Sequence, residues 1–131
     1  MLQLSHKKLI AYIKAKELCN LIYIITKQFP SHEQYNLISQ MRRAALSICS
    51  NISEGGSRES RKEKKRFYQI ARGSLIELDT QLEISGMLKY IDNSDMNKLE
   101  GLLEENFRLL SKMISTFSKA VNTEKNKPPS S

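Results

Sequence analysis

The chain has 131 residues and a formal net charge of +7, and it contains two cysteines and no tryptophan. A chain of this length forms one compact domain more readily than two. It has no apolar run of about 18 residues, and charges interrupt its first apolar residues, which argues against a membrane-spanning helix and a signal peptide. We therefore expect a cytoplasmic protein without a membrane partner.

Residues that break helices are scarce within the chain. The only prolines are Pro30, Pro128 and Pro129, which fall in an expected loop and near the C-terminus, and there are five glycines. The long stretches between these residues favour an all-α protein.

The first predicted helix covers residues 6–28. Its first half repeats apolar residues with a period near 3.6, and its second half is apolar almost all round. Pro30 disfavours helical backbone at Phe29, and Ser31 is a suitable N-cap for the next helix. The first helix should therefore end before "FPSHE".

The second predicted helix covers residues 32–55. Its apolar seam has spacings of 3, 4, 3 and 4, as expected for a bundle helix, and consists of Ile38, Met41, Ala45, Ile48 and Ile52. Gly55 and Gly56 should stop the helix, because glycine adopts the left-handed conformation without steric cost.

The third predicted helix covers residues 58–90. We expect one face to be buried, formed by Phe67, Ile70, Ala71, Ser74, Leu78, Leu82, Ser85 and Leu88. Gly73 costs about 1 kcal/mol relative to alanine inside a helix, so we expect a close helix crossing there.

The fourth predicted helix covers residues 94–121, after a turn at "DNSD". Its apolar residues have spacings of 3 or 4 throughout, and they are Met96, Leu99, Leu103, Phe107, Leu110, Ile114, Phe117 and Val121. Residues 122–131 are polar and are predicted to form a disordered tail. Four helices with short connections predict an antiparallel up-down-up-down four-helix bundle over residues 1–121.

Residue patterns typical of catalysis or metal binding do not occur. Cys19 and Cys49 fall on apolar helical faces and are expected to be buried free thiols, and His6 and His32 are expected at the surface. The chain lacks the E-x-x-H pattern of di-metal bundles, a P-loop and a serine nucleophile elbow. We expect no metal, no cofactor and no enzymatic activity.

Four polar residues lie within small or apolar segments of the second and third helices. They are Asn51, Glu54, Glu77 and Gln81. Because buried polar groups must be hydrogen-bonded, we expect them to form a polar network between helices that fixes their register.

Positive charge is concentrated in the first half of the chain. Residues 1–66 contain 13 Lys or Arg and 5 Asp or Glu, and residues 67–131 contain 8 and 9. The candidate nucleic-acid-binding residues are Arg42, Arg43, Arg58, Arg61, Lys62, Lys64, Lys65, Arg66 and Arg72. One interpretation is a solvated helix end. The other is a phosphate-binding surface, because cations early in a helix oppose its dipole and are not explained by helix stability.

Two segments carry a resemblance to a known family: "FPSHEQYNLISQMRRAALSICSNISEGGSRES" (29–60) and "RFYQIARGSLIELDTQLEIS" (66–85). They resemble the proteins encoded in intervening sequences of bacterial 23S ribosomal RNA genes, sometimes labelled S23 ribosomal proteins. Ser53 departs from the alanine frequent in the family. The resemblance implies a four-helix bundle that assembles as ring-like pentamers. It also implies kinship with the accessory proteins of diversity-generating retroelements, which bind a reverse transcriptase and nucleic acid.

Two functions remain open at this point. The first is a non-enzymatic oligomeric bundle that binds RNA or another nucleic acid through its basic surface. The second is a protein-interaction scaffold that engages a protein partner without contacting nucleic acid.

Overall fold

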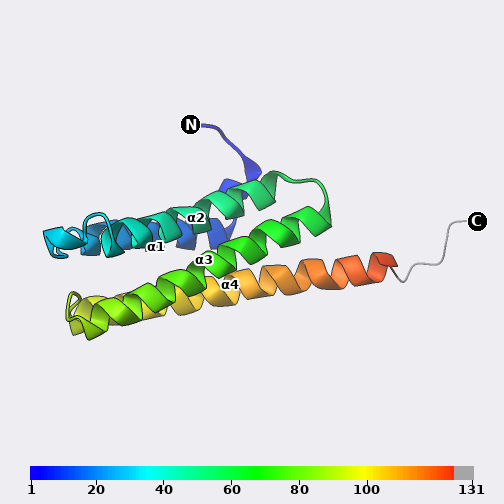
Figure 1. Cartoon of the computed structure of the whole chain (residues 1–131). Helices are drawn as coiled ribbons and strands as arrows, with labels where there is room; N and C mark the ends of the chain where they lie inside the picture. The colour runs from blue at the N-terminus through cyan, green and yellow to red at the C-terminus, as the bar shows by residue number, and fades with distance from the viewer. Residues whose placement is uncertain (126–131) are drawn as a thin grey trace, which may run out of the picture.

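The structure is a computed structural model that describes the backbone of residues 1–125 and every side chain among them except Lys8 and residues 119–125. Its four α-helices are α1 (Ile10–Thr26), α2 (Leu37–Ser57), α3 (Arg61–Met87) and α4 (Asn93–Lys125). Two short 3-10 helices, η1 (Ser5–Lys8) and η2 (Ser31–Glu33), precede α1 and α2. Residues 1–125 contain no strand. Successive helices run in opposite directions (Figure 1).

Each long helix packs against two neighbours around one core. α1 and α3 each contact both α2 and α4, so the four helices close into a bundle whose layers are α1 with α2 and α3 with α4 (Figure 1). All four helices contribute fully buried side chains, among them Leu18, Ile48, Leu78 and Leu110. The predicted all-α antiparallel four-helix bundle is confirmed.

The helix boundaries differ from the predicted ones at several ends. The first helix was predicted over 6–28, but α1 covers Ile10–Thr26, because residues 5–8 form the separate η1 and Leu9 is extended. The 3-10 helix η2 and a turn over residues 34–36 precede α2, which begins at Leu37. α3 ends at Met87, followed by Lys89 in the left-handed region with φ 62°. α4 continues to Lys125, so residues 122–125 are helical and the predicted disordered tail is wrong for them. The remainder of that tail, 126–131, lies outside the described residues.

The glycines that end α2 act differently from the prediction. Both Gly55 and Gly56 lie within α2, and no glycine of residues 1–125 has a positive φ. Gly55 is instead required for space, because a Cβ there would lie 2.6 Å from Cε1 of Tyr68 on α3. A Cβ on Gly56 would lie 2.5 Å from the Cβ of His6. His6 was predicted to lie at the surface, but it is buried.

The buried faces of α3 and α4 are rotated slightly from the predicted ones. On α3, Tyr68 is buried in place of the predicted Phe67, which is only half-buried. Ile70 and Leu88 were also predicted to be buried, but they are exposed. On α4 the buried residue is Asn106, at 1% exposure, and Phe107 is 44% exposed.

Gly73 is not a crossing point within this chain. It is exposed, and a Cβ placed on it would meet no described atom within 4 Å. The close approach of α2 to α3 occurs at Gly55 instead.

Candidate nucleic-acid interface

The α2–α3 turn gathers the densest positive charge at one end of the bundle. α2 ends at Ser57, and α3 begins at Arg61 after Ser60, whose hydroxyl accepts a hydrogen bond from the backbone N–H of Glu63 at 3.3 Å. This N-cap fixes where the helix starts and so where its first cations lie. We name the resulting surface the basic end; its residues are Arg58, Arg61, Lys62, Lys64, Lys65 and Arg66.

Lys64 has a structural role in the basic end. Its ammonium donates hydrogen bonds to the carbonyl oxygens of Gly55 and Gly56, each at 3.2 Å. The last carbonyls of a helix lack partners within it, and a cation there also interacts favourably with the helix dipole. The first turn of α3 therefore lies beside the negative end of α2, which explains part of the positive charge without any ligand.

Phe67 positions two guanidinium groups at the surface. The guanidinium carbons of Arg58 and Arg66 lie 5.0 Å and 5.6 Å from the centre of its ring. Arg58 also forms an ion pair with Glu54 at 3.1 Å, in which both side chains are about half exposed. Exposed ion pairs contribute little to stability, so a phosphate group can replace the carboxylate at low cost.

Two lysines of the basic end form no hydrogen bond, ion pair or ring contact with the described residues. They are Lys62, which is exposed, and Lys65, which is half-buried. Arg61 is exposed beside them on the first turn of α3. Free ammonium groups next to two stacked guanidinium groups make a surface suited to several phosphates.

Three of the nine predicted nucleic-acid-binding residues lie away from this surface. Arg42 donates to the hydroxyl of Thr26 at 3.0 Å and lies over the ring of Tyr23, so it joins α2 to α1. Arg72 donates to the hydroxyl of Ser111 at 3.1 Å and joins α3 to α4.

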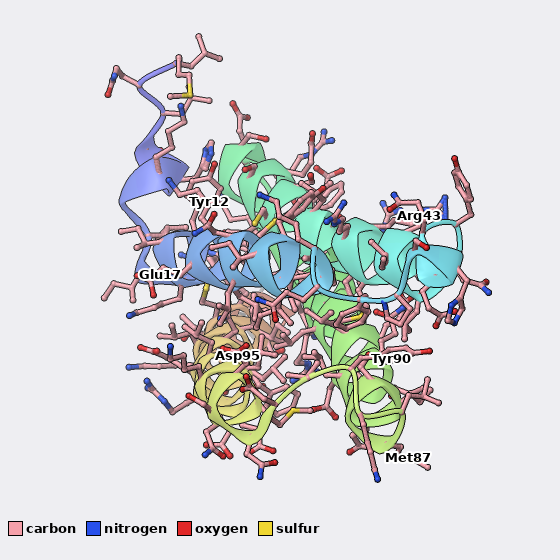
Figure 2. All side chains as sticks on the ribbon, turned by 90° about the vertical axis from the view of Figure 1, so that its left-hand side faces the viewer. Tyr12, Glu17, Arg43, Met87, Tyr90 and Asp95 are labelled. Carbon is pink, nitrogen blue, oxygen red and sulfur yellow. The ribbon has the colours of Figure 1, made fainter. Side chains whose placement is uncertain are left out.

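The third of these residues, Arg43, is exposed on the outer side of α2 (Figure 2). It lies about 20 Å along α2 from the basic end, given 1.5 Å per residue. The structure therefore brings six of the nine residues together and separates the other three.

The predicted polar network is divided into separate contacts. Asn51 donates to the carbonyl and the hydroxyl oxygen of Ser47, whose hydroxyl lies 2.8 Å from that of Ser74 on α3. Glu54 pairs with Arg58 in the same turn. Gln81 donates to Glu77 one turn earlier on α3 at 3.4 Å. Of these four residues only Asn51 takes part in a connection between helices of this chain, and it does so through Ser47. Contacts of the four residues with another subunit stay a prediction.

Sequence reasoning missed a buried polar residue elsewhere. Asn106 of α4 donates to the carbonyl oxygens of Lys14 on α1 and Leu102, at 3.2 Å and 2.8 Å. The neighbouring Phe107 fits the apolar spacing equally well, so that spacing gives no sign that Asn106 is the buried one.

The described residues contain neither a cluster of potential metal ligands nor a helix that could span a membrane. Among the side chains that the structure describes, no three of His, Cys, Asp or Glu lie together as potential metal ligands. None of the helices described has the length and apolar character needed to span a bilayer.

The family model for the 23S rRNA-intervening sequence protein matches residues 7–112. The chain belongs to this family. The match includes α1, α2, α3, the first part of α4 and the whole basic end, and it confirms the resemblance seen in the sequence. Kinship with the accessory proteins of diversity-generating retroelements stays a prediction.

One solved structure has a similar fold. It is a protein of unknown function from the S23 ribosomal protein family of Bacteroides thetaiotaomicron, with a TM-score of 0.73 and 20% sequence identity. The match covers 81% of this chain and 96% of that one. No curated protein matches the sequence. The family and the neighbour thus establish the fold and leave the activity open.

Proposed function

We propose that the protein is a non-enzymatic oligomer that binds RNA or another nucleic acid through the basic end. The observation that carries the proposal is the gathering of Lys62, Lys65 and two Phe67-stacked arginines on one exposed surface. The family's connection with ribosomal RNA genes supports a nucleic-acid partner. Lys64 belongs to the basic end, but its ammonium is bound to the last carbonyls of α2, so the proposal assigns it no phosphate contact.

The binding would be electrostatic and tolerant of sequence. Lysine and arginine contacts to phosphates release condensed counterions, so affinity falls steeply with salt. The ring of Phe67 lies against two guanidinium groups and is half-buried, so it is poorly placed to stack on a base. Specificity would therefore come from the shape of a folded nucleic acid more than from base contacts.

Self-association would multiply this modest surface. The exposed surface of α3 carries Ile70 and Ile84, with Gly73 between them in the sequence, and exposed Leu88 follows directly after the helix. A glycine that nothing in its own chain requires, within an exposed apolar stripe, suits the close approach of another helix. A ring such as the pentamer that the resemblance implies would present several basic ends at once, which increases avidity.

The proposal is tested with a triple variant of the basic end, Arg61→Gln, Lys62→Gln and Lys65→Gln. The control, Lys27→Gln, Lys89→Gln and Lys98→Gln, removes the same charge at the opposite end of the bundle. Binding of a labelled RNA stem-loop is measured by fluorescence anisotropy over a salt series. We expect only the first variant to lose affinity, and its slope of log K against log salt to decrease by about 2 per engaged subunit. Equal losses in both variants would show a net-charge effect and reject the surface.

The exposed apolar stripe of α3 also favours a second function, a protein-interaction scaffold. The same experiment separates the two functions. If the wild-type protein binds neither RNA nor DNA at low salt, the scaffold is favoured and the basic end serves solubility alone.

A further inference from the structure

Cys19 and Cys49 lie together in one surface pocket. Cys19 is on α1 and Cys49 on α2, and both thiols are free and partly exposed, not buried as the sequence suggests. The pocket is lined by Lys16, Cys19, Asn20, Tyr23, Leu46 and Cys49. Because the chain has no other cysteine, the fold places its entire thiol content at this point.

The two thiols are close enough in the pocket to affect each other's ionisation. Cys49 donates its S–H hydrogen bond to the sulfur of Cys19, and this bond lowers the pKa of Cys19 to about 7. The pKa of Cys49 is raised, because its proton is held in that bond, because the site is partly buried and because a second negative charge would face the first. The charged group nearby is Lys16, whose ammonium favours a thiolate here and lies over the ring of Tyr12 at 4.9 Å. Near neutral pH a substantial fraction of Cys19 is therefore thiolate beside the protonated Cys49.

We infer that Cys19 and Cys49 form a peroxide-reactive dithiol that closes to a reversible disulfide between α1 and α2. The basis is the pocket, open to solvent, whose lining includes both cysteines, and it is independent of the proposed nucleic-acid function. A thiolate that is accessible, next to a cation and next to a second thiol is the arrangement that oxidises selectively.

The reaction balances with hydrogen peroxide as the only oxidant. The Cys19 thiolate attacks one peroxide oxygen, the O–O bond breaks, and the hydroxide that leaves takes up a proton to give water. Cys19 is then a sulfenic acid. Cys49 loses its proton and attacks the Cys19 sulfur, the S–O bond breaks, and a second water leaves. Two thiols lose two electrons in total, and one peroxide becomes two waters; a small dithiol reverses the change by thiol–disulfide exchange.

The test treats the dilute, reduced protein with hydrogen peroxide and follows its intact mass. We expect the loss of two hydrogen atoms without dimer formation. Digestion with trypsin should then yield the peptides 17–27 and 44–58 joined by a bond that a dithiol reductant cleaves. An outcome of unmodified thiols, or of disulfide-linked dimers alone, would overturn the inference.

Two controls establish that the fold directs the reaction. In Cys49→Ser the resolving thiol is absent, so Cys19 should stop at a sulfenic acid that dimedone traps. In Cys19→Ser peroxide should react much more slowly. Peroxide treatment of the wild-type chain in denaturant should give a severalfold lower yield of the joined peptides, and an equal yield would mean that the folded pocket plays no part.

Discussion

The ring of Tyr68 on α3 occupies the space where Gly55 of α2 would carry a side chain, since a Cβ there would lie 2.6 Å from the ring. We expect Gly55→Ala to destabilise the fold by about 1–3 kcal/mol, because the ring is buried among core residues and must shift. Gly73→Ala is the matched control, since its Cβ meets nothing within 4 Å. It should stabilise the isolated subunit by up to about 1 kcal/mol through helix propensity. Urea denaturation of both variants measures the two effects.

Lys64 has a structural role at the end of α2 that its exposed neighbour Lys62 lacks. Lys64→Gln should lower the free energy of unfolding by about 1 kcal/mol, because two carbonyls at the end of α2 lose a charged donor. Lys62→Gln, two residues earlier, removes the same charge from an exposed side chain and should change stability by less than about 0.5 kcal/mol. Thermal denaturation of the two variants tests the difference. Equal losses would contradict the capping role.

Lys89 follows α3 in a conformation that glycine adopts more easily. Its φ is 62°, and the backbone N–H groups of Lys89 and Tyr90 donate to the carbonyl oxygens of Gly86 and Ser85 as in a Schellman motif. Lys89→Gly should stabilise the protein by about 1 kcal/mol, because the left-handed region costs other residues about that much. Lys89→Ala retains the strain and should show no such gain in the same denaturation experiment.

The thiol pair predicts a pH-dependent reactivity. Alkylation of Cys19 by iodoacetamide should increase with pH around a midpoint of about 7, because its thiolate accepts the hydrogen bond of Cys49. Cys49→Ala removes that donor and should move the midpoint upwards, whereas Cys49→Ser keeps a donor and should move it less. An unchanged midpoint in Cys49→Ala would show that the contact does not stabilise the thiolate.

The same thiol pair has a consequence for stability. The pKa of Cys19 is lower in the folded chain than in the unfolded chain. The ionised thiolate therefore stabilises the fold fully at pH values above the pKa of the unfolded chain, and this stabilisation is lost as pH falls through about 7. The raised pKa of Cys49 acts in the opposite direction at alkaline pH. We therefore expect the urea midpoint to increase between pH 6.5 and about 8 in the wild-type protein, and less so in Cys19→Ser.

The outer stripe of α3 predicts a variant that separates assembly from folding. Ile84→Glu places a charge at an exposed position and should leave the helical content unchanged. If the stripe mediates self-association, the variant should have a lower mass by light scattering at micromolar concentration. Glu83→Lys, next to it on the exposed surface, is the control for a change of charge.

Helical periodicity was sufficient to predict the order and direction of the four helices. It was insufficient for the choice between adjacent residues, because Phe107 and Asn106 are one position apart and both fit the apolar spacing of α4. Asn106 is buried because its amide reaches a carbonyl of α1, and Phe107 remains outside beneath Arg72, at 5.9 Å. Both contacts depend on neighbouring helices and have no trace in the local sequence.

The candidate site was predictable only as a run of charge. The division of its cations between structural and exposed roles depends on where the end of α2 lies, which decides that Lys64 caps a helix and Lys62 does not. Cys19 and Cys49 are far apart in the chain, and they come together because α1 packs against α2. The local sequence around either cysteine therefore does not predict their pairing.

The hydrogen bonds of Lys64 hold the first turn of α3 against the last turn of α2. A polyanion that bound the Lys64 ammonium would remove its hydrogen bonds to the carbonyl oxygens of α2 and destabilise the last turn of that helix. Lys64 therefore cannot bind a phosphate and cap α2 at the same time. Amide hydrogen exchange near Gly55 and Gly56 would therefore report which lysines a polyanion binds. We expect unchanged protection if the polyanion contacts only Lys62 and Lys65, and faster exchange if it also binds Lys64.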